Sequence, residues 1–183
     1  MIIIILTIAF VLRLININQS LWLDEGINVI FARALSYKDL IFSYSVGDFH
    51  PPFYHLILKT AIEIFGSSEL IVRLPSILFG VATVYVTYLI ARKLYDEKTG
   101  YIASTLMATA PLHIYYSQEA RMYSLAAFFT SLSVFYFISI IKKDRLVYWI
   151  GFILSTALML YCDYLPYLML PIYFLFLAYS KKI

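Results

Sequence analysis

The chain has 183 residues, of which 62% are hydrophobic and 14% are charged, and its formal net charge at pH 7 is +3. A soluble domain is about half apolar and about a quarter charged, so this composition excludes an ordinary soluble protein and indicates that lipid is the solvent. The lysines and arginines form short clusters between apolar runs, which argues against nucleic acid as a partner, and the single cysteine, Cys162, excludes a disulfide framework.

The N-terminal segment Met1–Ile17 is almost wholly apolar and is the first predicted membrane span. It has neither a basic leader nor a small-residue cleavage pattern, so we expect an uncleaved span rather than a signal peptide. At about 17 residues it is at the short end of what can cross a bilayer. Arg13 lies near its outer end, where a basic residue is not expected.

Residues 18–69 are predicted to form a long outer loop with two amphipathic helices lying on the membrane. The first has an apolar stripe at helical spacing, formed by Ile27, Ile30, Phe31, Ala34 and Leu35. The second, Pro51–Phe65, has an apolar stripe formed by Phe53, Leu56, Ile57, Ala61 and Ile64. Its other face repeats His55, Lys59 and Glu63, which we expect to be solvated. At about 15 residues Pro51–Phe65 is too short for a span, and a crossing there would invert every later loop.

Five further stretches are long enough to span: roughly Leu70–Ala91, Tyr101–Tyr116, Met122–Ile141, Leu146–Tyr161 and Leu165–Tyr179. Pro111 and a polar turn predict an irregular outer end for Tyr101–Tyr116. The sequence therefore predicts one all-α domain over residues 1–183, a polytopic transmembrane helix bundle of about six spans with two interfacial helices in its first outer loop.

The basic links between these spans orient the bundle. They are Arg92-Lys93, Lys142-Lys143-Asp144-Arg145 and Lys181-Lys182, and the positive-inside rule places them in the cytoplasm. Because each span crosses the membrane once, successive loops lie on alternate sides. With the basic links inside, residues 18–69 and the loop Ser117–Arg121 lie outside. We therefore predict a multi-pass plasma-membrane protein whose polar loops face the extracytoplasmic side.

The acidic pair Asp24-Glu25 lies just beyond the first span. In one interpretation Asp24 is the N-cap of a helix, and the helix dipole stabilises both carboxylates. In the other, a carboxylate shielded from water at the bilayer surface has a raised pKa and acts as a general base.

Other polar residues of the predicted outer side also have two interpretations. Glu119 and Arg121 form either a solvated turn with a local ion pair or a site for a phosphate or a metal. Arg73 is either an interfacial snorkelling residue or a phosphate contact. His113 is either a polar residue at a helix end or functional, and His50 shares the outer loop with Asp24.

The order and spacing of these segments resemble a known family. The matching residues are Trp22-Leu23-Asp24-Glu25, His50-Pro51-Pro52, Arg73-Leu74-Pro75-Ser76 with Phe79-Gly80, and Tyr116-Ser117-Gln118-Glu119-Ala120-Arg121. Each is a weak motif alone. Together they resemble the N-terminal half of C-type (GT-C) glycosyltransferases of the protein O-mannosyltransferase and aminoarabinose transferase superfamily.

The resemblance implies an enzyme that transfers a sugar, with inversion, from a polyprenyl-phosphate donor to a lipid, glycan or protein acceptor on the outer face. Asp24, with Glu25 beside it, would deprotonate or orient the acceptor hydroxyl. Arg121, Arg73 or Lys59 would stabilise the departing phosphate.

The remaining candidates have supporting roles under the same resemblance. His50 would assist the base or the phosphate contact. Glu119 would support the base, position Arg121, or hold a divalent cation together with Asp24. Tyr123 would stack on a sugar ring.

Many members of the family continue through several more spans and a soluble outer domain. We therefore expect either a truncated reading frame or a partner subunit that supplies the remaining spans. The main alternative function is a non-catalytic membrane protein that binds a lipid carrier or a partner subunit. A transporter or channel is disfavoured because charged residues are scarce within the spans.

Overall fold

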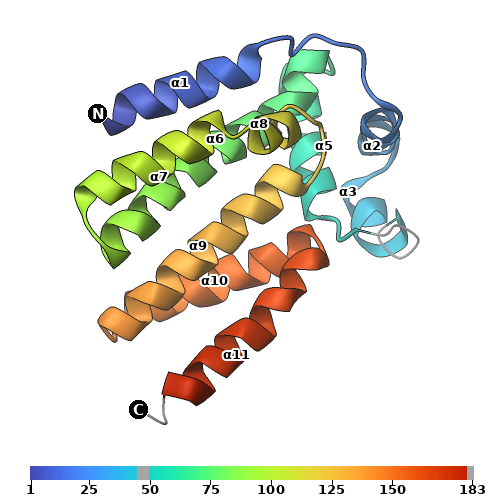
Figure 1. Ribbon diagram of the computed structural model, residues 1–183. Coiled ribbons are helices and arrows are strands. Elements are labelled where there is room, and N and C mark those ends of the chain that lie inside the picture. Colours follow the sequence, from blue (N-terminus) through green and yellow to red (C-terminus); the bar gives the residue numbers. More distant parts are fainter. Residues whose placement is uncertain (45–49, 181–183) are drawn as a thin grey trace.

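The computed structural model describes residues 1–44 and 50–180, and every regular element in these ranges is a helix (Figure 1). The elements are α1 (Ile2–Leu14), α2 (Leu23–Ala34), α3 (Tyr37–Asp39), the π-helix η1 (Leu40–Tyr44), α5 (Phe53–Phe65), α6 (Glu69–Leu94), α7 (Glu97–Thr109), α8 (Pro111–Ser117), α9 (Tyr123–Lys142), α10 (Leu146–Cys162), the 3-10 helix η2 (Leu165–Leu168) and α11 (Met169–Ser180). The all-α prediction is confirmed. The predicted basic link Lys181-Lys182 lies outside the described residues.

Two helices in the described ranges, α6 and α9, are long and apolar enough to cross a membrane. Shorter apolar helices cover Ile2–Leu14, Leu146–Cys162 and Leu165–Tyr179. The 13 residues of α1 extend only about 20 Å at 1.5 Å per residue, against a hydrocarbon core of about 30 Å. The number of spans, about six, stays a prediction.

The predicted span Tyr101–Tyr116 is divided between α7 and α8. Ala110 joins them with an extended backbone, at φ −64° and ψ 117°. A residue that precedes proline is driven out of the helical region by the proline ring, and Pro111 then begins the next helix. The irregular outer end expected from Pro111 is confirmed.

The long helix α6 is the centre of the bundle. It packs against α1, α5, α7, α8 and α9, and α9 in turn packs against α10. The α6–α7 and α9–α10 turns lie at one end, where Lys93 Nζ is 2.5 Å from Ser139 Oγ and Lys142 Nζ donates to the Lys93 carbonyl. The α1–α2 connection, α5 and the α8–α9 loop lie at the other end (Figure 1). Two of the predicted cytoplasmic links are therefore neighbours, opposite the acidic loops.

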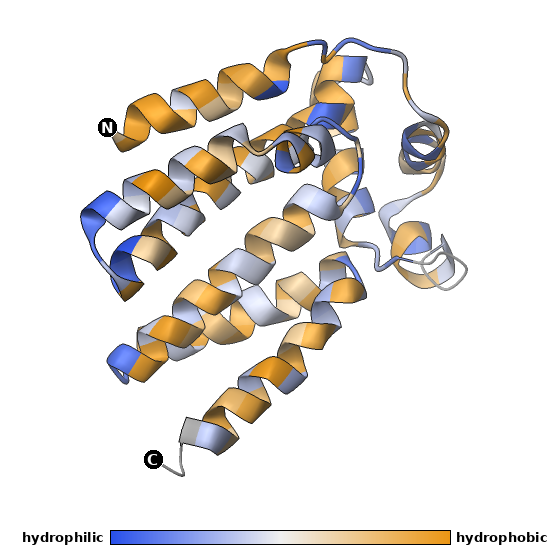
Figure 2. Ribbon diagram, viewed as in Figure 1, coloured by the Kyte–Doolittle hydropathy of each residue, from blue (hydrophilic) through white to orange (hydrophobic). Residues whose placement is uncertain are grey.

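Apolar side chains cover much of the outer surface of the bundle. Figure 2 shows hydrophobic residues along α1, α10 and α11 and hydrophilic residues concentrated at the turns. Many large apolar side chains on these helices are exposed, among them Ile3, Leu146, Val147, Ile153 and Phe174. Soluble proteins rarely expose a continuous apolar surface of this extent, because its contact with water is unfavourable. The bundle therefore has the surface of a membrane protein.

The two amphipathic helices α2 and α5 bury their polar faces, contrary to the prediction of a solvated face. His55 Nε2 lies 3.1 Å from Asn28 Oδ1, and Lys59 Nζ lies 3.3 Å from the carbonyl of Ala32. Asn28, His55 and Lys59 are all buried, whereas Glu63 is half-exposed. The expectation that His55 and Lys59 are solvated is wrong, because α2 and α5 pack on each other through these faces. Members of the apolar stripes face outward instead, including Ile30, which is 63% exposed, and Ile64, which is 64% exposed.

Candidate functional site

The loop between α8 and α9 connects every element at the acidic end of the bundle. Gln118 Nε2 donates to the carbonyl of Ile15 at 2.7 Å. The backbone N–H of Ala120 donates to Glu25 Oε1 at 2.7 Å, and its carbonyl accepts from Asn28 Nδ2 at 3.1 Å. Ser76 Oγ of α6 donates to the carbonyl of Arg121 at 3.1 Å. The loop is thereby fixed to α1, α2 and α6.

Glu25 and Arg73 form a buried bidentate ion pair. Arg73 Nε and Nη2 lie 2.9 Å and 2.7 Å from the two carboxylate oxygens of Glu25. Nη1 donates to the carbonyls of Ile17 at 2.5 Å and Gln19 at 2.8 Å, and Nη2 also donates to that of Ser20 at 3.4 Å. A guanidinium has five N–H donors, so the donors of Arg73 are fully used.

Glu25 is equally well satisfied. In addition to Arg73, it accepts from the backbone N–H of Ala120 at 2.7 Å and of Trp22 at 2.9 Å. Burial alone raises the pKa of the Glu25 carboxyl, but the hydrogen bonds from Arg73, Ala120 and Trp22 together outweigh burial and hold its pKa below the ordinary value. Glu25 is therefore a fixed carboxylate that joins α2, α6 and the α8–α9 loop.

Asp24 has a different environment, although it is the neighbouring residue. Its side chain is 51% exposed, and Oδ2 lies 2.6 Å from Nη1 of Arg121. Asp24 is not the N-cap, since α2 begins at Leu23 with Trp22 as N-cap, so that part of the interpretation is wrong. Both carboxylates do lie in the first turn of α2, as expected of residues that the helix dipole favours. Its carboxylate retains a solvent-facing side.

Arg121 is mostly buried, with 12% of its side chain exposed, but its donors are only partly used. Nη2 donates to the hydroxyl of Tyr123 at 3.2 Å, and the guanidinium lies over the Tyr123 ring, 5.3 Å from its centroid. Nε is buried and has no hydrogen-bond partner among the described residues. Arg121 can therefore bind an anion in addition to Asp24, unlike Arg73.

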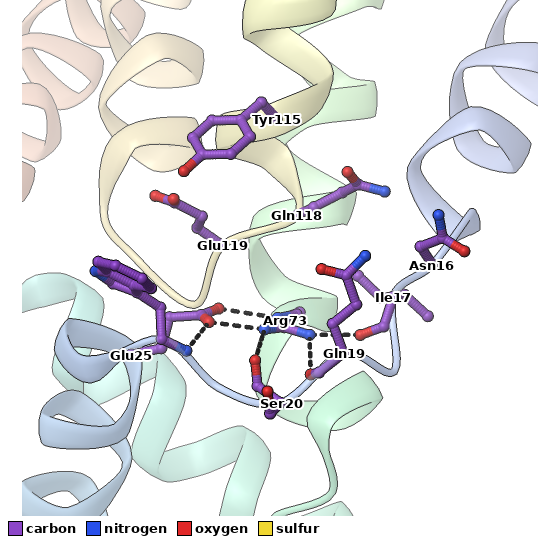
Figure 3. Close-up of a pocket in the computed structure, with 10 residues that line it drawn as sticks. Asn16, Ile17, Gln19, Ser20, Glu25, Arg73, Tyr115, Gln118 and Glu119 are labelled. Carbon is purple, nitrogen blue, oxygen red and sulfur yellow. Dashed lines mark hydrogen bonds and ion pairs between the residues drawn. The ribbon is translucent and has the colours of Figure 1, made fainter.

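A polar cavity of about 290 Å³ lies beside the Glu25–Arg73 pair. Its walls come from the α1–α2 connection, Trp22 and the α8–α9 loop, including Asn16, Gln19, Tyr115, Gln118 and Glu119. Figure 3 shows the Tyr115 hydroxyl pointing toward the Glu119 carboxylate on one side, with the Glu25–Arg73 pair on the other. Amides, a carboxylate and aromatic rings around a cavity of this size suit a hydroxyl-rich ligand.

An apolar groove of about 530 Å³ lies between α9, η2 and the helices α6 to α8. Tyr123 is one of its lining residues, together with Ala126, Ala127, Leu165, Pro166 and Met169. Because the hydroxyl of Tyr123 also accepts from Arg121, the groove leads to the Asp24–Arg121 pair. A hydrocarbon chain in this groove would have its polar end near that pair.

The other two predicted site residues lie elsewhere in the loop region. Lys59 pairs with Glu63 Oε1 at 2.9 Å and lies 5.2 Å from the centroid of the Tyr37 ring, so its charge is directed to the far side of α5. His50 is half-buried and precedes the turn at Pro51-Pro52 that begins α5.

Among residues 1–44 and 50–180, no three His, Cys, Asp or Glu side chains lie together as metal ligands would. Asp24, one of the two ligands expected for a cation, is paired with Arg121 instead. The donor set around Asp24 therefore does not fit a resident divalent cation.

Three residues that position the site were not identified from the sequence. Asn28, Ser76 and Gln118 each hold the α8–α9 loop through one side-chain hydrogen bond or more. Ser76 and Gln118 carried a signal, because both lie within motifs that resemble the family. Nothing in the pattern around Asn28 distinguishes it from an ordinary polar residue on a helix.

Comparison with known proteins gives an independent result. The family described as "Dolichyl-phosphate-mannose-protein mannosyltransferase" matches residues 49–183. The chain is 26% identical over 156 residues to the Bacillus subtilis protein named "Putative mannosyltransferase YkcB", a match that covers 80% of this chain and 22% of that protein. It is 24% identical over 145 residues to an uncharacterized protein of Aquifex aeolicus, covering 78% of this chain and 29% of that protein. The chain thus spans between about a fifth and a third of the length of these relatives. No solved structure gives a significant match.

Proposed function

Because the chain belongs to the dolichyl-phosphate-mannose-protein mannosyltransferase family of GT-C glycosyltransferases, we propose that it transfers a sugar from a polyprenyl-phosphate donor to an acceptor hydroxyl. The transfer takes place on the extracytoplasmic face and inverts the anomeric carbon. The observation that carries this proposal is the half-exposed Asp24–Arg121 pair, which reaches the apolar groove through Tyr123.

Asp24 is the general base of the proposed reaction. The acceptor oxygen attacks the anomeric carbon as its proton passes to the Asp24 carboxylate, and the bond from that carbon to the phosphate oxygen breaks. Attack from the side opposite the departing phosphate gives inversion. Asp24 suits this role because half of its side chain is accessible, whereas Glu25 accepts four hydrogen bonds and has no free side.

Arg121 stabilises the departing polyprenyl phosphate. Its Nε and the remaining hydrogens of its Nη groups can donate to the phosphate oxygens while Nη1 still contacts Asp24. Tyr123 orients the guanidinium, and the hydrocarbon chain of the carrier occupies the apolar groove.

Glu25 and Arg73 are positioning residues in this proposal, because their pair fixes α2 and thereby the direction of Asp24. The polar cavity beside them receives the acceptor or the donor sugar, with Glu119 accepting from a sugar hydroxyl. Lys59 supports the site only indirectly, because it joins α5 to α2 through the carbonyl of Ala32.

The proposed membrane position follows from the exposed apolar surfaces. The outward stripes of α2 and α5 lie in the outer leaflet interface, and α1, α6, α7 with α8, α9, α10 and α11 cross the bilayer. A cysteine-labelling scan tests this: positions 24 and 119 should react from outside, and positions 97 and 143 from inside. Labelling of position 68 from inside would contradict the surface placement of α5.

The activity is tested with the chain in lipid nanodiscs, radiolabelled polyprenyl-phosphate mannose and a panel of lipid, glycan and protein acceptors. Mannose is the first sugar to test because of the names of the family and of the Bacillus subtilis relative. We expect wild-type protein to form an α-linked product from a β-linked donor and Asp24→Asn to lose about 10²–10⁴-fold in rate. Donor binding without turnover by wild-type protein would instead support a non-catalytic carrier-binding protein.

A further inference from the structure

Buried Arg13 and partly buried His113 form a pair of basic side chains where the end of α1 meets α8. Arg13 is completely buried, and its Nη1 donates to the carbonyl of Ala9 at 2.8 Å. Its Nη2 lies 2.5 Å from Nδ1 of His113. A guanidinium can only donate, so Nδ1 must accept. His113 is therefore a neutral imidazole with its proton on Nε2.

The charge of Arg13 has no acidic counterpart nearby. In residues 1–44 and 50–180, the carboxylates that form ion pairs with side chains do so with Lys59, Arg73 and Arg121, not with Arg13. Burying an unpaired cation costs solvation free energy, and a negatively charged ligand near Arg13 would offset this cost.

The absence of a side chain at Gly80 of α6 provides space for the Arg13 guanidinium. A Cβ atom on Gly80 of α6 would lie 3.1 Å from Arg13 Nε and 2.2 Å from Ser117 Oγ. Only glycine permits this approach of α6, α8 and the guanidinium. The position of Arg13 is thus built into the packing of three helices.

His113 turns its second nitrogen away from Arg13 and lines the apolar groove. Its Nε2 is buried and has no hydrogen-bond partner among the described residues. The carboxylate of Asp163, which also lines the groove, accepts instead from the backbone N–H of Leu165 at 3.1 Å. A buried N–H donor that no described residue satisfies, next to a positive charge and at the wall of an apolar groove, is complementary to an anionic oxygen on a hydrocarbon chain that enters the groove.

We propose that His113, held in this tautomer by Arg13, donates to a phosphate oxygen of a polyprenyl phosphate whose chain lies in the groove. Tyr123 lines the same groove, so the same phosphate is held between His113 on one side and Arg121 on the other. This inference rests on the proposed function for the class of lipid. It adds a substrate-binding residue, His113, and a positioning residue, Arg13, that the resemblance to the family did not point to.

Binding to the full chain in phosphatidylcholine nanodiscs tests the proposal with three probes: a polyprenyl monophosphate, the polyprenol of equal length, and inorganic phosphate. We expect His113→Phe to weaken binding of the lipid phosphate about tenfold, the loss of one hydrogen bond to a charged group, and to leave polyprenol binding unchanged. Thr105→Val, a near-isosteric change on α7 at a residue that does not line the groove, is the matched control and should affect neither lipid.

Three results of this experiment would overturn the proposal. His113→Phe weakens both lipids equally, it weakens neither, or inorganic phosphate binds at His113 as tightly as the lipid phosphate does. The first would assign His113 to the shape of the groove, and the third would make it a site for a free anion.

Nitrogen NMR of the histidine side chains tests the tautomer in wild-type protein, with His113→Phe to assign the signal among the three histidines. The expected Nε2–H resonance of His113 should move when the polyprenyl phosphate is added. A doubly protonated ring, or no movement, contradicts the proposal. Asp24→Asn should lose transfer but keep the His113-dependent binding, so failure of the catalytic proposal is distinguishable from failure of this one.

Discussion

The Glu25–Arg73 and Asp24–Arg121 pairs have the same chemistry and nearly the same place in the molecule, but opposite environments. In the first pair, 3% of the acidic side chain is exposed and every arginine donor is used. In the second, 51% of the acidic side chain is exposed, and the arginine has a buried N–H that none of the described residues accepts. The first pair is therefore suited to stabilising the fold, and the second is suited to contacting a substrate.

The geometry of one helical turn produces this division. Neighbouring residues of an α-helix point about 100° apart, so Asp24 and Glu25 cannot face the same way in the first turn of α2. Glu25 points into the junction of α6 and the α8–α9 loop, and Asp24 points to the rim beside Arg121. A tandem acidic pair thereby provides one anchor and one accessible carboxylate.

Breaking the buried pair should have the largest effect on stability. Arg73→Met leaves Glu25 as an uncompensated buried carboxylate, so we expect a loss of about 3–5 kcal/mol in the free energy of unfolding. Denaturant unfolding in detergent micelles measures this. Asp24→Asn is the control and should cost less than about 1 kcal/mol, because half of the Asp24 side chain is exposed to water. Equal losses in the two variants would contradict the division between the pairs.

Changing Arg121, whose donors are only partly used, should affect the rate rather than the fold. Arg121→Lys keeps the positive charge but loses Nε and the fork of donors, so we expect transfer to fall by about 10²–10³-fold. The free energy of unfolding should change by less than about 1 kcal/mol. Steady-state kinetics with the polyprenyl-phosphate donor separate kcat from KM. A variant with wild-type kcat would show that Arg121 makes no contact with the departing phosphate.

Acid should weaken the buried pair through Glu25. Because the folded pKa of Glu25 is lowered, its contribution to stability is complete above the ordinary value of 4.5 and is lost as the pH falls below it. We expect Glu25→Gln to be less stable than wild type at pH 7 and to show a smaller further loss below pH 4.5. Unfolding monitored by circular dichroism from pH 7 to 3 measures both. Parallel curves would mean that Glu25 does not titrate with unfolding.

The smallest effect is expected at the pair of buried Lys59 and half-exposed Glu63. Glu63 is half-exposed, so Glu63→Gln should cost less than about 0.5 kcal/mol in the same unfolding assay. This variant sets the baseline for an ion pair that neither anchors the fold nor contacts substrate. A larger cost would show that burial is not what separates the pairs.

The sequence predicted the helical class, the order of the apolar helices and the break at Pro111. It also predicted that Asp24, Arg73 and Arg121 lie at one end of the bundle, because parity places their loops together. These features depend on hydropathy and local chain geometry, which a single sequence records.

The sequence could not predict which faces meet. The polar face of α5 looked solvated because periodicity identifies a face but not its neighbour, and the neighbour, Asn28, is 27 positions away from His55. The pairing of Arg13 with His113 is likewise invisible, since the two residues are 100 positions apart and neither is acidic. Whether Asp24 or Glu25 is accessible depends on Arg73 and Ala120, which only the folded chain brings to Glu25.

Asp24 and Glu25 are expected to have separate roles, Asp24 as the general base and Glu25 as the carboxylate that holds the fold. Sugar transfer and folding, measured on the same variants, test this separation. Asp24→Asn and Glu25→Gln are compared with wild type at a temperature where circular dichroism shows all three folded, using radiolabelled polyprenyl-phosphate mannose. We predict that Asp24→Asn stays folded and loses transfer by about 10²–10⁴-fold, whereas Glu25→Gln unfolds more easily but transfers within about tenfold of wild type. A folded Glu25→Gln without transfer, beside an active Asp24→Asn, would contradict the claim and make Glu25 the base.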